Sequence, residues 1–385
     1  MSTVEAYNKV CAPILFLSKV IGVEIWNPEK TFSLASYVLM TNMVLYNTCS
    51  AYTVIKHAGD PLQMMKIIII FGIASQLIFK FFTSVAKKKS FHALFEQAKT
   101  SIYCDFQNGT VEEKALIEKT TNFLSLGWKI MSALYFSSLF IFGVWPVYVY
   151  YSENELVPLF YYEIPYVDIN QSTGYALTLL LHIDIYLMGV FGTILADYAF
   201  VFVAFQAMLF VDLLILNLKQ LDSMLISTNR EDDLVTKAER WRVCLKYHQL
   251  ATEYLNNVED CFGLICLIQV FGCVFTICDS MVILVLTDWY AAYGFLLVIF
   301  VELSIYFHLG NMVELKVDEL YSSITSLSWN LLTLSQQNEF AFVMARQQRS
   351  LMLTIFGFAP MNYETYTSVL RALYQFFVII LQSLS

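Results

Sequence analysis

Seven apolar segments, each near the length that crosses a lipid bilayer, constrain this chain more than any other feature. A helix needs about 20 consecutive apolar residues to span the hydrocarbon core, and none of the seven segments carries more than two charged residues. Hydrophobic residues make up 58% of the sequence and charged residues 14%, against about 45–50% and about 25% in soluble proteins. We therefore predict an all-α, polytopic membrane protein with seven transmembrane helices. The segments cover residues 31–55, 67–86, 130–152, 175–210, 261–287, 289–312 and 361–385.

The distribution of Lys and Arg predicts the orientation in the membrane, because cytoplasmic loops are enriched in these residues. A cytoplasmic N-terminus places 18 of the 23 Lys and Arg residues in inner segments and only 2, Lys56 and Lys66, in outer ones. Seven spans then put the C-terminus outside the cell. This orientation is opposite to that of G-protein-coupled receptors, whose Asp-Arg-Tyr and Asn-Pro-x-x-Tyr motifs are also missing from the third and seventh segments.

We expect four regions along the chain. The apolar stretch 12–23 is short and interrupted by Lys19, so it predicts a re-entrant or interfacial helix rather than a signal peptide. Near the other end, Gly357 and Pro360 predict the end of a cytoplasmic helix at 339–356, because proline lacks an N–H and disfavours helix at the residue before it. The regions are a cytoplasmic N-terminal segment at 1–30, spans one to six with their loops at 31–312, cytoplasmic helices at 313–358, and the seventh span at 359–385.

Several function classes find no support in the sequence. The net charge of −9 offers no basic face for a nucleic acid. No HExxH, GxSxG or Walker A motif occurs, and the five His are scattered, so we expect no enzyme, no metal and no cofactor. The eight Cys contain no CxxC pair, and thiols inside apolar helices usually pack as small hydrophobic groups.

The last third of the chain resembles the insect odorant receptors. The stretch FGFAPMNYETYTSVLRALYQFF at residues 356–377 is similar to the C-terminal signature of that family. Gly310-Asn311, Tyr321 and Trp329 resemble the connection between its sixth and seventh spans. One departure is Gln375, where the family often has Ser. Size, span number and orientation match over the whole chain.

This resemblance implies a subunit of a heterotetrameric, odorant-gated, non-selective cation channel in the plasma membrane of olfactory sensory neurons. Its partners would be a shared co-receptor subunit, a small volatile odorant, membrane lipid, and monovalent and divalent cations. The co-receptor of the family carries a long insertion between spans four and five. Residues 206–260 are too few for that insertion, so the chain resembles a tuning subunit.

The expected ligand site is a small apolar cavity with few polar groups, and the resemblance puts it in the outer half of the bundle. Aromatic side chains at that depth offer face and edge contacts, and Tyr and Trp add a polar group. Each residue alone could instead serve helix packing or an interfacial aromatic belt. The candidate residues are Ile68, Phe71, Gly72, Phe142, Trp145, Leu179, His182, Ile183, Tyr186, Tyr290 and Tyr293.

The resemblance also implies that the last span lines the pore. Ile379 and Ser383 are four residues apart and share a helix face, and a ring of Ile379 could gate by excluding water. Gln382 and Ser383 would be its polar neighbours. Arg371, near the middle of this span, should either pair with Asp279 or Glu302 or face water, because a charge at that depth seldom faces lipid.

Two alternatives remain at this stage. A proton-coupled transporter could use Asp184, Asp279 and Glu302, since acids inside a membrane are functional candidates by default. A gustatory-type receptor channel shares the inverted plan with seven spans. The C-terminal signature favours the odorant type, because the gustatory pattern Thr-Tyr-x-x-x-x-x-Gln-Phe is absent from the last span.

Overall fold

The protein is described here by a computed structural model covering residues 2–23, 29, 32–227, 234–287, 289, 291–349 and 351–384. The described residues form helices, with one isolated β-bridge between Thr354 and Pro360. The α-helices are α1 (Thr3–Ile21), α2 (Leu34–Lys56), α3 (Pro61–Ala86), α4 (Lys88–Ala98), α5 (Val111–Glu153), α6 (Ser172–Ser227), α7 (Leu234–Leu286), α8 (Ala291–Thr325), α9 (Leu334–Gln347) and α10 (Tyr363–Leu384). Three short turns of other helix types are η1 (Lys99–Cys104), η2 (Asp105–Asn108) and η4 (Trp329–Leu331).

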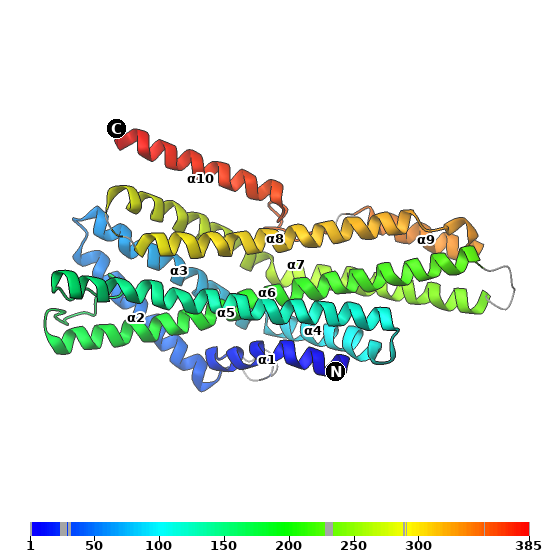
Figure 1. The fold of residues 1–385 in the computed structure, drawn as a ribbon, viewed down its shortest axis with the longest axis horizontal. Helices are drawn as coiled ribbons and strands as arrows, with labels where there is room; N and C mark the ends of the chain where they lie inside the picture. The colour runs from blue at the N-terminus through cyan, green and yellow to red at the C-terminus, as the bar shows by residue number, and fades with distance from the viewer. Residues whose placement is uncertain are drawn as a thin grey trace.

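Four long helices, α5 to α8, run side by side along the long axis of the molecule (Figure 1). With 56 residues, α6 is about 84 Å long at 1.5 Å per residue, well beyond the ~30 Å of membrane hydrocarbon. We call the end with the α5–α6 and α7–α8 connections the outer end, and the end with α9 the inner end. Within the described residues, five helices are long and apolar enough to cross a membrane: α3, α5, α6, α7 and α8. The predicted all-helical membrane fold is confirmed, while spanning by α2 and α10 stays a prediction.

The central helix is α6, whose residues 197–204 are all buried. A helix that is apolar all round must be surrounded by other helices, and α6 packs against α1, α3, α5, α7 and α8. The hydroxyl of Tyr198 donates to the backbone carbonyls of Val10 at 3.2 Å and Leu124 at 3.3 Å. The middle of α6 is thereby joined to both α1 and α5.

Helices α3 and α7 approach each other through two reciprocal pairs of a glycine and a polar residue. A Cβ atom on Gly272 of α7 would lie 2.3 Å from side-chain atoms of Gln76 on α3. One turn away, a Cβ atom on Gly72 of α3 would lie 3.0 Å from the Thr276 hydroxyl on α7. Small residues allow membrane helices to approach closely, so each glycine makes the space that the opposite polar side chain fills.

We expect Gly272→Leu to lower the stability of the folded chain by about 1–3 kcal/mol, because the added carbon atoms overpack the contact with Gln76. The measurement is the melting temperature of the purified chain in lipid nanodiscs. Gly127→Leu is the matched control, since a Cβ atom on Gly127 of α5 meets nothing within 4 Å. Equal melting temperatures for both variants would show that α3 and α7 do not depend on this close contact.

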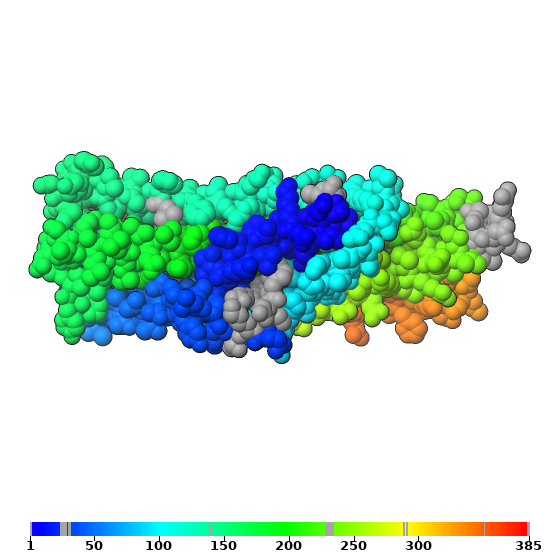
Figure 2. Space-filling model, turned by 90° about the horizontal axis from the view of Figure 1, so that it is seen from below, coloured from blue at the N-terminus to red at the C-terminus, as the bar shows by residue number. Residues whose placement is uncertain are grey.

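Helix α1 is longer than the short helix predicted at 12–23, and it lies along the bundle. Figure 2 shows it on the surface beside the segments of α2 and α4. One face is buried, and its Tyr7 hydroxyl donates to the Phe95 carbonyl at 2.9 Å. A capping box at Ser2 and Glu5 begins the helix, and Gly22 in the left-handed region ends it. The apolar stretch 12–23 is therefore the second half of a helix that packs on α5 and α6.

The predicted cytoplasmic helix at 339–356 is wrong at both ends. The helix found there, α9, begins at Leu334 and ends at Gln347. Residues 351–361 instead form a tight turn, in which the Met361 N–H donates to the Leu353 carbonyl at 2.9 Å. Gly357, with φ of 76°, adopts the left-handed conformation that glycine favours, and Phe356, with φ of 51°, adopts it too. The backbone thus reverses before α10 begins.

Candidate functional site

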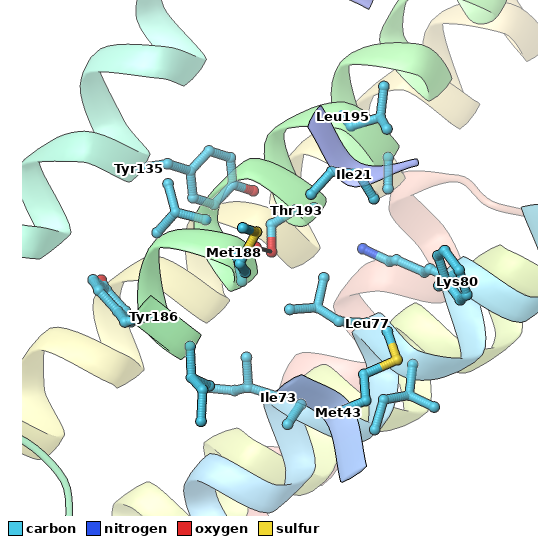
Figure 3. Close-up of a pocket in the computed structure, with 18 of the residues that line it drawn as sticks. Ile21, Met43, Ile73, Leu77, Lys80, Tyr135, Tyr186, Met188, Thr193 and Leu195 are labelled. Carbon is cyan, nitrogen blue, oxygen red and sulfur yellow. Dashed lines mark hydrogen bonds between the residues drawn. The ribbon is translucent and has the colours of Figure 1, made fainter. Parts of the chain in front are cut away.

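A cavity of about 210 Å³ lies inside the bundle, walled by α2, α3, α5, α6 and α8. It extends from Phe160, in the outer loop between α5 and α6 (residues 154–171), toward the inner end of the bundle, where residues at the end of α1 line it. Figure 3 shows Met43, Ile73 and Leu77 on one side of the space and Tyr135, Met188 and Thr193 on the other. Its apolar lining includes Ile21, Val23, Leu39, Met43, Ile70, Ile73, Leu77, Phe142, Val190, Phe295 and Ile299.

The outer wall of the cavity is a loop that His182 of α6 holds in place. The backbone N–H of Phe160 donates to His182 Nδ1 at 3.3 Å, and Nε2 lies 3.0 Å from the Tyr162 carbonyl oxygen. This pattern requires the neutral ring with its proton on Nε2. Phe160 and Tyr162 line the cavity, and both rings pack on the His182 ring. His182 thus positions two cavity residues without lining the cavity itself.

The same loop is fastened to the outer end of α2 through Glu163. Its backbone N–H donates to Thr53 Oγ1 at 2.7 Å, and its carboxylate accepts from Lys56 and lies 3.0 Å from His57 Nε2. Partial burial would raise the pKa of Glu163, but the hydrogen bonds from Lys56 and His57 outweigh burial and hold that pKa below its ordinary value. The carboxylate therefore stays ionised at neutral pH, and the loop stays clamped between α2 and α6.

A buried charged cluster forms one wall near the inner end of the cavity. Lys80 Nζ lies 2.9 Å from Asp197 Oδ1 and 3.3 Å from Glu302 Oε1, and these three side chains are almost fully buried. Asp197 also accepts hydrogen bonds from the hydroxyls of Tyr135 and Tyr306. The cluster joins α3, α5, α6 and α8, and Lys80, Glu302 and Tyr135 line the cavity. Buried charges persist when they are paired and hydrogen-bonded, and this cluster satisfies both conditions.

Several other polar groups of the cavity wall are hydrogen-bonded within the protein. The hydroxyls of Tyr186 and Ser138 form a hydrogen bond across α6 and α5. Asn42 of α2 donates to Asp184 of α6 at 2.8 Å, and Asp184 itself lies on the exposed side of α6. What remains open to a small molecule is therefore mainly apolar surface.

Two of the eleven predicted pocket residues, Phe142 and Tyr186, line this cavity. The rings of these two residues meet edge to face with centroids 5.8 Å apart. Phe71, Ile183 and Tyr293 face away from the bundle, with 48%, 38% and 57% of their surface exposed. The position of a residue along a span gives its depth in the membrane, but the rotation of each helix decides which side chains point inward.

The remaining candidates within the described residues do not line the cavity. Gly72 packs against α7, and Ile68 and Leu179 are half-buried. Trp145 packs with the outer cluster of aromatic residues that includes Phe142. Tyr290 lies outside the described residues. For all eleven residues, contact with a ligand stays a prediction.

The predicted pore residues lie on α10, which is angled away from the bundle (Figure 1). Ile379 is 64% exposed and Gln382 is exposed, while the side chain of Ser383 lies outside the described part. The suggested pairing of Arg371 with Glu302 is wrong, because Glu302 binds Lys80. Arg371 is exposed on α10, and the alternative that it faces water stays a prediction.

The three acids considered for proton transport do not form a connected path. Glu302 belongs to the charged cluster, and Asp184 bonds to Asn42 on the outside of the bundle. Asp279 lies on α7, and its Oδ2 has no hydrogen-bond partner among the described residues. The charged cluster was not predicted, although the sequence contains one signal for it. Lys80 is the only basic residue well inside spans two to six, and the acids in those spans are the partners expected for it.

Comparison with known proteins gives a consistent result. A family model described as the 7tm odorant receptor family matches residues 60–374. The putative odorant receptor 83c of Drosophila melanogaster is 22% identical over 390 aligned residues, which cover 97% of this chain and 98% of that protein.

Solved structures agree on the fold. The insect olfactory receptor OR5 from Machilis hrabei in complex with eugenol superposes with a TM-score of 0.74 at 14% identity, covering 98% of this chain and 99% of that one. A second structure of the same receptor gives a TM-score of 0.72 at 14% identity, covering 91% of this chain and 90% of that one.

Proposed function

Since this chain belongs to the insect odorant receptor family, we propose that its odorant occupies the cavity between α2, α3, α5, α6 and α8. The chain is an odorant receptor subunit rather than an enzyme, and the family acts as ion channels. The observation that carries the proposal is the cavity itself: it lies between the helices and the loop held by His182 and Glu163, and its wall is mainly apolar. Small-molecule sites are concave and mostly apolar, with few polar groups that fix orientation.

The size of the cavity limits the ligand. An apolar cavity of about 150 Å³ holds benzene, so a cavity of about 210 Å³ suits a molecule on the order of ten heavy atoms. Eugenol, the ligand named for the OR5 structure, is a compound of about this size with an aromatic body. A ligand here would pack against Phe142 and Phe295, whose ring centroids lie 4.2 Å apart.

Helix α8 offers a route from the cavity to the proposed pore helix. Ile299 and Glu302 of α8 face the cavity. Just beyond them, Ser304 Oγ hydrogen-bonds the Tyr366 hydroxyl of α10 at 2.6 Å, and Phe307 stacks on the Tyr366 ring at 5.1 Å. A ligand that shifts α8 would therefore shift the start of α10. We assign the seventh span at 359–385 to the pore lining, with Ile379, Gln382 and Ser383 near its outer end.

The exposed apolar surface of α10 supports assembly with other subunits. Tyr374 and Ile379 are 68% and 64% exposed, on a helix whose contacts are mainly with α7 and α8. A membrane helix angled away from its own bundle leaves its surface free to pack against the helices of a neighbouring subunit. We propose a heterotetramer with the shared co-receptor, in the plasma membrane of olfactory neurons, with a cytoplasmic N-terminus and an external C-terminus. In this arrangement residues 313–358 anchor the assembly on the cytoplasmic side, and monovalent and divalent cations permeate.

The test is current recording from cells that express the chain with and without the co-receptor while a panel of volatiles is applied. We expect at least one volatile to evoke a cation current in co-expressing cells and little current from the chain alone. Cells with the co-receptor alone control for responses that the chain does not supply. Robust evoked current from the chain alone would reject the tuning-subunit assignment, and a saturable flux coupled to a proton gradient would reject the channel.

A further inference from the structure

The outer end of the cavity carries two buried tyrosine hydroxyls without hydrogen-bond partners. They belong to Tyr46 of α2 and Tyr162 of the outer loop, which are 3% and 1% exposed, and both residues line the cavity. Neither hydroxyl has a partner among the described residues. The Ser50 hydroxyl, one turn further along α2, interacts with that of Tyr46 without reaching hydrogen-bond geometry. A buried polar group without a partner costs about 1–3 kcal/mol, so two at one place require an explanation.

The two rings come from separate elements and contact each other edge to face, with centroids 5.2 Å apart and planes at 84°. The Tyr162 ring is fixed by His182, which packs on it at 4.2 Å and bonds its backbone carbonyl. The Tyr46 ring is fixed by its burial in a hydrophobic cluster that also contains Phe142 and Tyr162. The two rings are thus already positioned at the outer end of the cavity.

At the inner end of the cavity the polar side chains already have partners. There Lys80, Asp197 and Glu302 pair with one another, and Tyr135 and Tyr306 donate to Asp197. A ligand head group placed there would have to compete with these bonds. At the outer end it would only satisfy hydroxyls that lack partners, so the outer end is the better polar subsite.

We propose that the hydroxyls of Tyr46 and Tyr162 form a polar subsite for a hydrogen-bond acceptor on the odorant, so that this receptor favours volatile ketones, aldehydes or esters. This inference rests on the proposed function of the cavity and adds the chemical class of its ligand. A phenol O–H is a donor, and a carbonyl oxygen is an acceptor that brings no donor needing a partner of its own. The apolar body of the ligand would extend along the cavity toward Leu77. A site built to hydrogen-bond a ligand discriminates strongly against an analogue that lacks the bonding group.

The experiment compares two probes of the same shape and about nine heavy atoms, 2-octanone and 2-methyl-1-octene, in which a methylene group replaces the carbonyl oxygen. Equilibrium binding of tritiated probes to the full chain in lipid nanodiscs is measured for wild type, Tyr46→Phe and Tyr162→Phe. Each variant is compared with wild type for the same probe, so partitioning into lipid cancels. We expect each variant to bind 2-octanone about three- to tenfold more weakly and to bind the alkene with unchanged affinity.

Tyr254→Phe is the matched control, because the Tyr254 hydroxyl is also buried and unpartnered among the described residues but does not line the cavity. It should change the binding of neither probe. Loss of an unpaired hydroxyl should leave the melting temperature of all three variants at or above that of wild type, so weaker binding would not reflect misfolding.

A cavity-filling variant, Gly189→Leu, separates failure of this inference from failure of the proposed function. If Gly189→Leu blocks both probes while Tyr46→Phe and Tyr162→Phe bind 2-octanone like wild type, the cavity is the site and the tyrosine subsite is rejected. A trapped water that bonds to the hydroxyls in place of the ligand would give these same binding data, and the tyrosine subsite would be rejected in that case too. If Gly189→Leu binds both probes like wild type, the cavity is not the ligand site and both proposals are overturned.

Discussion

Replacing Lys80 with methionine should lower the stability of the folded chain by about 3–5 kcal/mol, because removing one partner of a buried ion pair leaves an uncompensated charge. Lys80 is the only cation bound to Asp197 and Glu302 in the described part of the chain. Its loss leaves two carboxylates without a cation in the middle of the bundle. Folded proteins are stable by about 5–15 kcal/mol, so we expect surface expression to fall sharply and the melting temperature of the purified chain to drop.

Two control variants show whether the loss of stability in Lys80→Met comes from the unpaired carboxylates. Lys89→Met removes a lysine from the exposed side of α4, and a surface substitution of this kind should stay within about 0.5 kcal/mol of wild type. The triple variant Lys80→Met, Asp197→Asn, Glu302→Gln removes all the charges, and an uncharged replacement of a buried ion pair is often neutral. We therefore expect the triple variant to recover much of the loss. A Lys80→Met chain as stable as Lys89→Met would show that the cluster is not held by its charges.

Filling the cavity should abolish the odorant response, and Gly189 is the residue from which to fill it. Gly189 and Gly192 of α6 line the cavity opposite Leu77, and Cβ atoms at these two positions would lie 3.7 Å and 3.8 Å from the Leu77 methyl carbons. These are ordinary contact distances, so alanine fits without a clash. A leucine at 189 adds three further carbon atoms to a space of about 210 Å³. We expect Gly189→Leu to raise the half-maximal odorant concentration at least about 100-fold, which corresponds to roughly 3 kcal/mol of lost binding.

The measurement is a concentration–response series of evoked current in cells that co-express the co-receptor, at matched surface expression. Gly189→Ala should change sensitivity little and should not destabilise α6, because alanine favours helix over glycine by about 1 kcal/mol. Gly143→Leu is the second control, since a Cβ atom on Gly143 of α5 meets nothing within 4 Å. Wild-type sensitivity in Gly189→Leu would exclude this cavity as the odorant site.

The architecture was predictable from sequence because hydrophobic length is a strong physical signal. Segments of about 20 apolar residues without charges have few alternatives to a membrane helix, and the structure has long helices where the third to sixth segments predicted them. The predictions were wrong where local backbone geometry determines the end of a helix. The helix expected over 339–356 ends at Gln347, because residues 351–361 form a turn around Gly357. Apolar periodicity alone does not report such a turn.

The ligand site was harder to predict for a different reason. Phe71 and Phe142 are both aromatic and lie at similar depths, yet Phe71 is 48% exposed and Phe142 is buried at the cavity wall. A membrane helix can be apolar on its lipid face and on its core face alike, so no amphipathic pattern reveals its rotation. The loop residues Phe160 and Tyr162 were missed because their inward position depends on His182, which is distant in sequence.

The measurement that tests the central claim most directly is a cryo-electron microscopy map of the chain assembled with its co-receptor, determined with and without an activating volatile. We predict ligand density inside the cavity between α2, α3, α5, α6 and α8, in contact with Phe142 and Tyr186, and the absence of that density from the map without the volatile. Ligand density elsewhere on the subunit, with the cavity unchanged between the two maps, would contradict the account.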